Sequence, residues 1–222
     1  RERNFKDGER DSTWTTWYEN GNKKFLASYS DGKLNGKYIR WYEGGIIKEL
    51  DGEYLNNKKH KKWIYWSKNG QKTEEINYDN GVHHGSHIKW FGEKSDQHKK
   101  FHINYKNGDK DGNWRHWYSS GVDSLKATYL NGEKDGHWIW WRKNGLKDKE
   151  GFYKKEKKHG LWTIWNDSTG SAYHKLHEET YVNDAIDGKV TKWYKEGGLD
   201  RQGIMRGKEK EGEWTYWERG GK

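Results

Sequence analysis

The chain has 222 residues, contains no cysteine or proline, and is only 30% hydrophobic, against roughly 45–50% in ordinary globular domains. This composition excludes a thiol nucleophile, a thiolate metal site and a large aliphatic core. A charged fraction of 35% alone would suit a disordered chain, but 16% of the residues are Phe, Trp or Tyr, in which disordered chains are poor. We therefore predict an ordered fold built on aromatic side chains.

The charge balance favours acidic partners. Lys and Arg number 43 and Asp and Glu 34, which leaves a net charge of +9. Phospholipid head groups, nucleic acid or an acidic protein would suit this excess, although a solvated surface is the simpler explanation. No apolar run approaches the ~18 residues of a membrane-spanning helix, so we predict no transmembrane segment. The sequence starts at Arg1 and leaves the compartment open: cytoplasmic, or exported after removal of a signal.

From residue 5 onward one pattern recurs along the chain. An aromatic residue is followed by Gly three residues on, a second Gly at seven, Trp at nine and at twelve, and a Gly turn near sixteen. Most copies are 24 or 25 residues apart. Two longer steps contain SDQHKKFHIN (95–104) and STGSAYHKLHEE (168–179), which we interpret as insertions. The nine copies begin at Phe5, Tyr29, Tyr54, Tyr78, Tyr105, Tyr129, Tyr153, Tyr181 and Met205.

Two columns of the repeat contain fifteen of the sixteen tryptophans. The residue at position twelve is Trp in all nine copies: Trp17, Trp41, Trp66, Trp90, Trp117, Trp141, Trp165, Trp193 and Trp217. Position nine is aromatic or apolar with one exception: Trp14, Tyr38, Trp63, His87, Trp114, Trp138, Trp162, Val190 and Trp214.

The Trp-containing segments are short and bounded by glycine, which favours β-strands over helices. We place tight hairpin turns at the Asn-Gly dipeptides 20–21, 69–70 and 144–145, because both residues of such a turn need positive backbone angles. Each repeat then supplies a Trp-rich strand, a turn, a second strand ending in Tyr, and a Gly-x-x-x-Gly connection. Where the first Gly of that connection is replaced, we expect a looser turn; the replacements are Asn57, Glu156, Asp184 and Lys208.

These elements predict an all-β protein: an elongated, single-layer, twisted antiparallel sheet of nine ~24-residue β-hairpin repeats, forming one array over residues 1–222. Because side chains alternate along a strand, Trp138 and Trp141 should face opposite sides, which makes both faces aromatic. Cross-strand aromatic pairs contribute roughly 0.2–1 kcal/mol each. Such pairs hold a sheet together without a second layer.

The pattern Y-x-N-G-x-x-x-G-x-W-x-x-W-Y-x-x-N-G, as in YKNGDKDGNWRHWYSSG from Tyr105, resembles the bacterial variant of the MORN repeat (membrane occupation and recognition nexus). The resemblance covers nearly the whole chain. It implies a single-layer antiparallel sheet of hairpins that acts as a non-catalytic scaffold. Bacterial members are often labelled antitoxin components, and eukaryotic relatives have been linked to membranes and protein assembly. A looser similarity is to choline-binding cell-wall modules, whose shorter repeats form ligand cages from aromatic side chains.

Residues with catalytic or metal-binding chemistry form no convincing set. His83, His84 and His87 surround a Gly turn where only two of them would converge, whereas a closed zinc site needs four ligands. His174 and His177, beside Glu178 and Glu179, fit no better. The adjacent Glu74 and Glu75 lie in a polar strand without a deep pocket. No Gly-rich loop precedes a helix. We predict a protein that is not an enzyme and has no cofactor or metal site.

Three groups of side chains are candidates for partner binding. Two basic clusters occupy the same inter-hairpin connection in repeats three and seven, and should lie along one edge as an attractive surface for anions; solvated turn lysines are the plainer alternative. Aromatic residues between the two Trp columns are candidates for stacking on sugars or caging quaternary ammonium groups. The candidates are Lys58, Lys59, Lys61 and Lys62 with His60, then Lys154, Lys155, Lys157 and Lys158, and finally Tyr65, Trp140 and Tyr216.

We therefore predict a repeat scaffold that binds a protein partner, either a toxin that it neutralises or a member of an assembly. The alternative function is a ligand module for glycan, choline-like or anionic lipid head groups. A third hypothesis is edge-to-edge association with further copies, since exposed strand edges invite pairing. Nucleic acid is not an expected partner, because the tryptophans that would stack on bases are needed by the fold.

Overall fold

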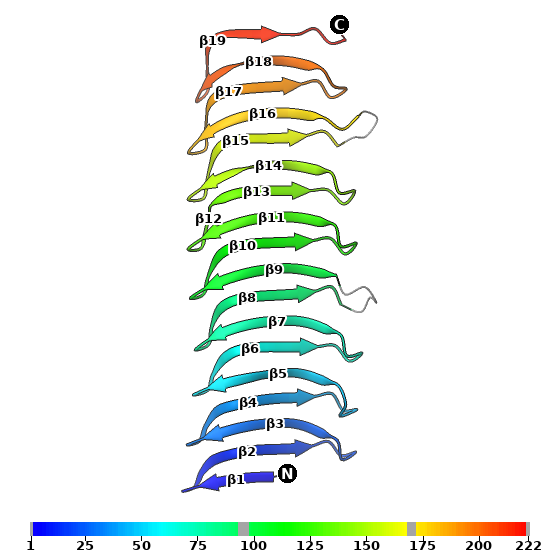
Figure 1. The fold of residues 1–222 in the computed structure, drawn as a ribbon, viewed down its shortest axis with the longest axis vertical. Helices are drawn as coiled ribbons and strands as arrows, with labels where there is room; N and C mark the ends of the chain where they lie inside the picture. The colour runs from blue at the N-terminus through cyan, green and yellow to red at the C-terminus, as the bar shows by residue number, and fades with distance from the viewer. Residues whose placement is uncertain (1, 93–97, 168–171, 221–222) are drawn as a thin grey trace. The chain divides into compact units, whose positions relative to one another are not determined.

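The computed structural model describes residues 2–92, 98–167 and 172–220. Parts of the two predicted insertions, 95–97 and 168–171, lie outside the described residues. The regular structure described is all β-strand, and the strands form an open antiparallel sheet of 19 strands (Figure 1). The predicted fold class of successive β-hairpins is confirmed. Within the described ranges, no helix has the length and apolar character that crossing a membrane requires.

The chain divides into two compact units, Arg1–Lys110 and Asp111–Lys222. The first carries nine strands and the start of a tenth: β1 (Glu2–Lys6), β2 (Glu9–Trp17), β3 (Lys23–Ser30), β4 (Lys33–Trp41), β5 (Lys48–Leu55), β6 (Lys58–Trp66), β7 (Lys72–Asp79), β8 (Val82–Trp90), β9 (Lys99–Lys106) and β10 (Asp109–Trp117). The second carries most of β10 and then β11 (Asp123–Leu130), β12 (Glu133–Lys134), β13 (Gly136–Trp141), β14 (Lys147–Lys154), β15 (Lys157–Trp165), β16 (Lys175–Val182), β17 (Ala185–Trp193), β18 (Leu199–Arg206) and β19 (Glu209–Tyr216).

Within each unit, the strands pair with their neighbours in sequence, except that β12 and β13 both pair with β11. Nine hairpins would give eighteen strands, and the nineteenth arises because one Trp-rich strand is divided at Asp135 into β12 and β13. Each Trp-rich strand is joined to the preceding strand by a two-residue turn and to the following one by a longer loop of five to nine residues. The predicted single array over residues 1–222 stays a prediction.

The predicted two-residue turns at Asn-Gly 20–21, 69–70 and 144–145 are wrong, because these dipeptides lie in the longer loops. The two-residue turns are at the Gly-x-x-x-Gly connections, three of which contain an Asn-Gly of their own, at 80–81, 107–108 and 131–132. At Asp31 and Gly32, φ is 48° and 72°, so both central residues have the left-handed backbone that suits a twisted hairpin. In the loop at 18–22, only Gly21 has a positive φ, of 82°. The side chain of Asn20 there accepts the backbone N–H of Asn22 at 3.0 Å, which favours Asn in a loop without a two-residue turn.

The turns without glycine are as tight as the others, so the expectation of looser connections is wrong for three of the four replacements. Asn57, Glu156 and Asp184 have φ of 65°, 66° and 71°. Each side chain accepts a backbone N–H of the preceding hairpin: Asn57 from Leu34 at 2.7 Å, Glu156 from Lys134 at 2.6 Å, and Asp184 from Lys158 at 2.8 Å. These hydrogen bonds offset the ~1–2 kcal/mol that a left-handed backbone costs a residue with a Cβ.

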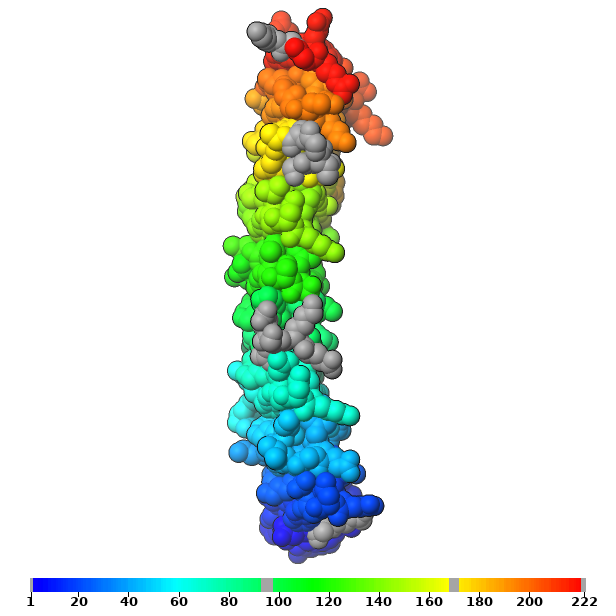
Figure 2. All heavy atoms as spheres, turned by 90° about the vertical axis from the view of Figure 1, so that its right-hand side faces the viewer, coloured from blue at the N-terminus to red at the C-terminus, as the bar shows by residue number. Residues whose placement is uncertain are grey.

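The loops form the opposite edge of each unit, which faces the viewer in Figure 2. A tyrosine that begins the loop reaches the next repeat: the Tyr18 hydroxyl donates to the carbonyl of Trp41 at 2.7 Å, and Tyr42 donates to Trp66 at 2.8 Å. Tyr118 and Tyr194 repeat the contact in the second unit. Successive repeats are therefore tied together at both edges.

The second Gly of the connection forms a β-bulge that shapes the core. Gly36 has φ of 101°, and the pairing between β3 and β4 shifts its register there. Lys61 replaces this Gly in repeat three and still adopts φ of 58°. The position-nine indole bonds to the backbone beside this bulge: the Trp63 N–H donates to the carbonyl of Glu53 at 3.0 Å.

Candidate functional site

One side of the sheet, which we call the ladder face, holds most of the buried hydrophobic side chains. It carries the position-nine residues, the repeat-starting tyrosines and, two positions before each tyrosine except Tyr181, a small or apolar residue. Trp63 is 1% exposed, and its ring centroid lies 4.9 Å from that of Tyr54. The ring covers Gly52 so closely that a Cβ there would lie 2.3 Å from it. Aromatic rings packed on backbone thus replace an aliphatic core.

The ladder face also carries a row of cations over its aromatic rings, which the sequence did not reveal. The ammonium of Lys59 lies 4.4 Å from the Trp63 ring centroid and 5.1 Å from that of Tyr78, the next repeat's first residue. We call such a cation, five residues after the repeat start and held between two aromatic rings, a rung. Equivalent contacts are made by Arg10, Lys134 and Lys158. Lys210 lies over Trp214 and Tyr216, both of its own repeat. The signal was a basic residue at this offset in most copies.

The three candidate ligand-binding aromatics contact the chain's own lysines. The Tyr65 hydroxyl accepts a hydrogen bond from Lys59 at 2.8 Å, and Tyr216 accepts one from Lys210 at 2.6 Å. The ammonium of Lys149 lies 4.8 Å from the Trp140 ring centroid. A quaternary ammonium ligand would need these faces free, so the structure does not favour the choline-cage alternative.

The first basic cluster is divided between the two sides of the sheet. Lys59 is the rung just described, and Lys61 forms an ion pair with Glu53 at 2.8 Å. Lys62 approaches Glu75 at 4.0 Å, and Lys58 is exposed. His60 lies 3.4 Å from Asp79. These side chains therefore do not form one continuous basic surface.

The second basic cluster is divided in the same way. Lys158 is a rung, 4.6 Å from the Trp162 ring centroid and 4.7 Å from that of Tyr181. Lys155 is in the two-residue turn, while Lys154 and Lys157 face each other across it and are exposed. Each cluster lies at the tight-turn edge of its own unit.

The other side of the sheet, which we call the tryptophan face, carries the position-twelve column. Trp138 and Trp140 contact each other with ring centroids 5.5 Å apart on the ladder face, so the alternating Ile139 and Trp141 lie on the opposite side, as predicted. The nine position-twelve tryptophans are all half-buried: Trp17, Trp41, Trp66 and Trp90 in the first unit, and Trp117, Trp141, Trp165, Trp193 and Trp217 in the second.

Paired charges accompany these tryptophans. Lys147 binds Glu150 at 3.0 Å, and its ammonium lies 5.3 Å from the Trp165 ring centroid. Lys72 binds Glu75 at 2.6 Å. Lys48–Asp51 and Lys175–Glu178 are further pairs of the same spacing. The tryptophan face therefore presents indoles bordered by both signs of charge.

Repeat four replaces two ladder residues by histidine. His87 stands in the Trp column, 2.8 Å from a carboxylate oxygen of Glu74, and this hydrogen bond holds the pKa of Glu74 below its usual value. His83 stands at the rung position, with its ring centroid 4.9 Å from that of Tyr78 and 5.1 Å from that of Tyr105. Burial lowers the pKa of His83, and the nearby His87 and Lys59 lower it further.

The remaining candidate chemistry is dispersed. Glu74 faces the ladder side, whereas Glu75 binds Lys72 on the tryptophan face, so the two carboxylates do not act as a pair. His84 accepts the backbone N–H of Asn107 at 3.4 Å. Within the described ranges, no group of three or more His, Asp or Glu side chains is arranged to hold a metal ion.

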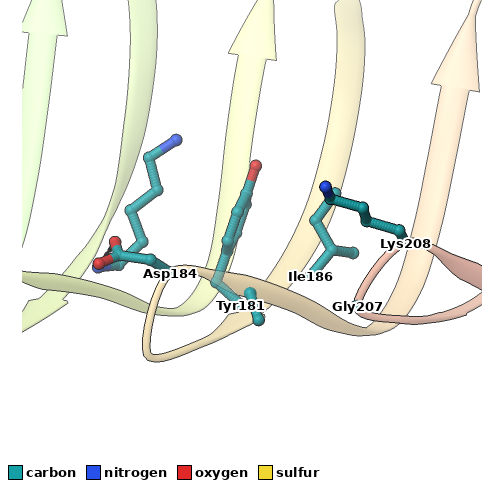
Figure 3. Close-up of a pocket in the computed structure, with 7 residues that line it drawn as sticks. Tyr181, Asp184, Ile186, Gly207 and Lys208 are labelled. Carbon is teal, nitrogen blue, oxygen red and sulfur yellow. Dashed lines mark hydrogen bonds between the residues drawn. The ribbon is translucent and has the colours of Figure 1, made fainter.

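Repeat eight interrupts the ladder, which the sequence analysis did not recognise as a site. Ile186 replaces the rung cation, Val190 the Trp and Met205 the next tyrosine. Two hollows meet at Ile186: one of about 650 Å³ beside the turns, drawn in Figure 3, and one of about 240 Å³ along the strands. The first is lined by Lys158, Tyr181, Asp184, Ala185, Ile186, Gly207 and Lys208. The second is lined by Glu179, Ile186, Val190, Lys192, Arg201, Met205, Lys210 and Trp214.

No family model matches the chain, and a search of curated proteins finds no match. The functional conclusions below therefore rest on the residues and geometry described above.

Proposed function

We propose that the chain is a non-enzymatic repeat scaffold that binds a protein partner through its tryptophan face. The supporting observation is the column of position-twelve indoles, which are half-buried although most of the buried hydrophobic side chains lie on the other side of the sheet. Tryptophan is among the residues that contribute most to binding energy at protein interfaces. A row of such side chains with regular spacing suits an extended contact with one partner.

The charges on this face favour a protein over a polyanion. Lys48–Asp51, Lys72–Glu75 and Lys147–Glu150 place a positive and a negative group together beside the indoles. A membrane surface or nucleic acid is recognised by an excess of one sign, whereas a protein surface offers both. The dispersed basic clusters support the same preference.

The resemblance to bacterial MORN-variant repeats supports membership of that family and two uses of such a scaffold. One is neutralisation of a toxin, and the other is the organisation of an assembly. Both need a rigid surface and no reacting groups, in keeping with the separate positions of Glu74 and Glu75. The glycan or choline-like alternative gains no specific support, because Tyr65, Trp140 and Tyr216 contact internal lysines.

The test is capture of partners from an extract of the native organism on immobilised protein, with elution in steps of rising salt. We expect the wild-type chain to retain a defined protein at high salt. The double variant Trp41→Gln/Trp66→Gln should retain at least tenfold less of that protein. Trp140→Gln is the matched control, since it removes a half-buried indole from the ladder face. Failure to retain any protein, or equal retention by the double variant, would refute the proposal.

A further inference from the structure

In repeat eight, the two hollows that meet at Ile186 form one apolar hollow on the ladder face. In other repeats, side chains of the repeat itself occupy the corresponding space. In repeat seven, the ammonium of Lys158 lies over the rings of both Trp162 and Tyr181. In repeat nine, Lys210 lies 4.9 Å from the Trp214 ring centroid. Between these two rungs, Ile186, Val190 and Met205 provide shorter and smaller side chains, so apolar volume is missing from the row.

The walls of the hollow are apolar, and its rim is basic. Figure 3 shows the ring of Tyr181 on one side and Ile186 with Lys208 on the other, while Gly207 contributes no side chain. Lys158 and Lys208 border the first hollow, and the second is bordered by Lys192, Arg201 and Lys210. The five cations outnumber the two acids that line the hollows, Asp184 and Glu179.

Both acids already have partners within the chain. Asp184 accepts the backbone N–H of Lys158 at 2.8 Å. Glu179 accepts the hydroxyl of Tyr181 at 2.6 Å and lies 3.6 Å from Lys192. Among the described residues, Lys208 makes no ion pair. Arg201 lies 3.7 Å from Asp200, and Lys158 and Lys210 lie over aromatic rings. The ammonium of Lys208 is therefore available to a ligand, and the other cations add to the positive potential around it.

We propose that this hollow binds an extended acidic peptide segment of a partner protein, with one large apolar side chain of that segment inserted against Ile186, Val190 and Met205. The apolar side chain replaces the volume that Trp and Lys supply in other repeats. Acidic neighbours of that side chain meet the cations of the rim. The site is separate from the tryptophan face and does not depend on the function proposed for it.

A cationic side chain is not the expected occupant, although lysines fill the corresponding space elsewhere. Rung cations are attracted by the faces of two aromatic rings. Here Val190 and Met205 offer no such faces, and the basic rim repels a further positive charge. The same replacements that open the hollow thus change the class of ligand that it accepts.

The test uses fluorescence anisotropy with a fluorescein-labelled peptide, EDEFLDED, and two comparison peptides. EDESSDED keeps the charge and lacks the apolar side chains, and QNQFLNQN keeps the apolar side chains and lacks the charge. We expect measurable binding of EDEFLDED and at least tenfold weaker binding of both comparison peptides. No binding of EDEFLDED, or equal binding of EDESSDED, would overturn the proposal, the latter because it would reveal charge attraction alone.

Variants locate the binding in the hollow. Ile186→Lys restores the rung of the other repeats, Met205→Tyr fills the hollow from a second wall, and Lys208→Glu reverses the rim; each should weaken EDEFLDED binding at least fivefold. Leu34→Lys is the matched control, because Leu34 is the other aliphatic residue at the rung offset and lies in the first unit. Melting curves verify the fold of each variant.

Unchanged binding to both filled variants, or equal loss in Leu34→Lys, would contradict the assigned location. Binding to anionic phosphatidylserine vesicles in place of the peptide would contradict the assigned ligand. Ile186→Lys should still capture the partner of the tryptophan face, so failure at this site is distinguishable from failure of the function proposed above.

Discussion

The indole N–H of Trp162 donates a 3.0 Å hydrogen bond to the carbonyl of Phe152, and its ring lies where a Cβ on the adjacent Gly151 would come within 2.2 Å. Trp63 with Gly52 and Trp214 with Gly203 repeat this relationship. The core unit is therefore a ring seated on bare backbone.

Gly151→Ala should destabilise the chain by about 1–3 kcal/mol, because the added methyl group displaces the ring of Trp162. Urea denaturation followed by tryptophan fluorescence measures the loss. Gly44→Ala is the control, since a Cβ there meets nothing within 4 Å, and it should change stability by less than about 0.5 kcal/mol. Equal effects of the two substitutions would contradict the close packing.

Substitutions at Asn57 distinguish the cost of its left-handed backbone from the contribution of its side-chain hydrogen bond. Asn57→Gly relieves the left-handed backbone and loses the 2.7 Å bond from Leu34, so the two effects nearly cancel. Asn57→Ala loses the bond and keeps the backbone cost. We expect the Ala variant to be about 1 kcal/mol less stable than the Gly variant in thermal unfolding, and the opposite order would refute this account of the turn.

Lys59→Met should lower stability by about 1–2 kcal/mol, since it keeps a long side chain but removes the cation held by Trp63 and Tyr78. Lys58→Met on the same strand is exposed and should be nearly neutral. Chemical denaturation of both variants at low and high salt provides the measurement. A loss of stability in Lys59→Met that disappears at high salt would indicate a screened surface attraction, and would contradict the position of this cation between two aromatic rings.

Acidification should destabilise the first unit in two steps. The pKa of His83 is lower in the folded chain than the usual value near 6.5, because burial disfavours its charged form. The unfolded chain therefore binds the proton more readily, and stability present above pH 6.5 is lost as the pH falls below it. The depressed pKa of Glu74 stabilises the fold above its ordinary pKa, and that contribution is lost at lower pH, as Glu74 becomes protonated.

His83→Gln should reduce the loss of stability between pH 7 and pH 5, measured by melting temperature. His102 also has a pKa lowered by burial, so adding His102→Gln should flatten the profile further. An unchanged dependence of melting temperature on pH in His83→Gln would show that protonation of another group causes the loss of stability. Lys59, Glu74 and His87 remain in place in both variants.

Much of the fold followed from spacing alone, because position twelve and position nine recur with a fixed period and side chains alternate along strands. The turn positions did not, because Asn-Gly fits both a two-residue turn and a loop that ends in a left-handed Gly. Non-glycine turns were mispredicted because the hydrogen bond that supports Asn57 comes from another hairpin. Such a bond has no signature in local sequence.

The site was harder to predict because charged residues are usually read as solvated. Lys59 and Lys158 belonged to apparent surface clusters, yet their ammonium groups lie over aromatic rings. Ile186 carries no chemistry of its own, and becomes notable only when the rung column is aligned across all repeats. Its role is visible only by comparison with the cations at the same position of neighbouring repeats.

The loop tyrosines have a consequence for how the chain opens. Tyr18 and Tyr42 each tie a repeat to the one that follows, a directional nearest-neighbour coupling. At Ser67, the corresponding hydroxyl bonds within its own loop, to Asn69 and to the carbonyl of Gln71. That junction lacks the tyrosine's coupling and forms a seam. Hydrogen exchange along the loop edge should therefore be faster on either side of Ser67 than at the junctions tied by Tyr18 and Tyr42.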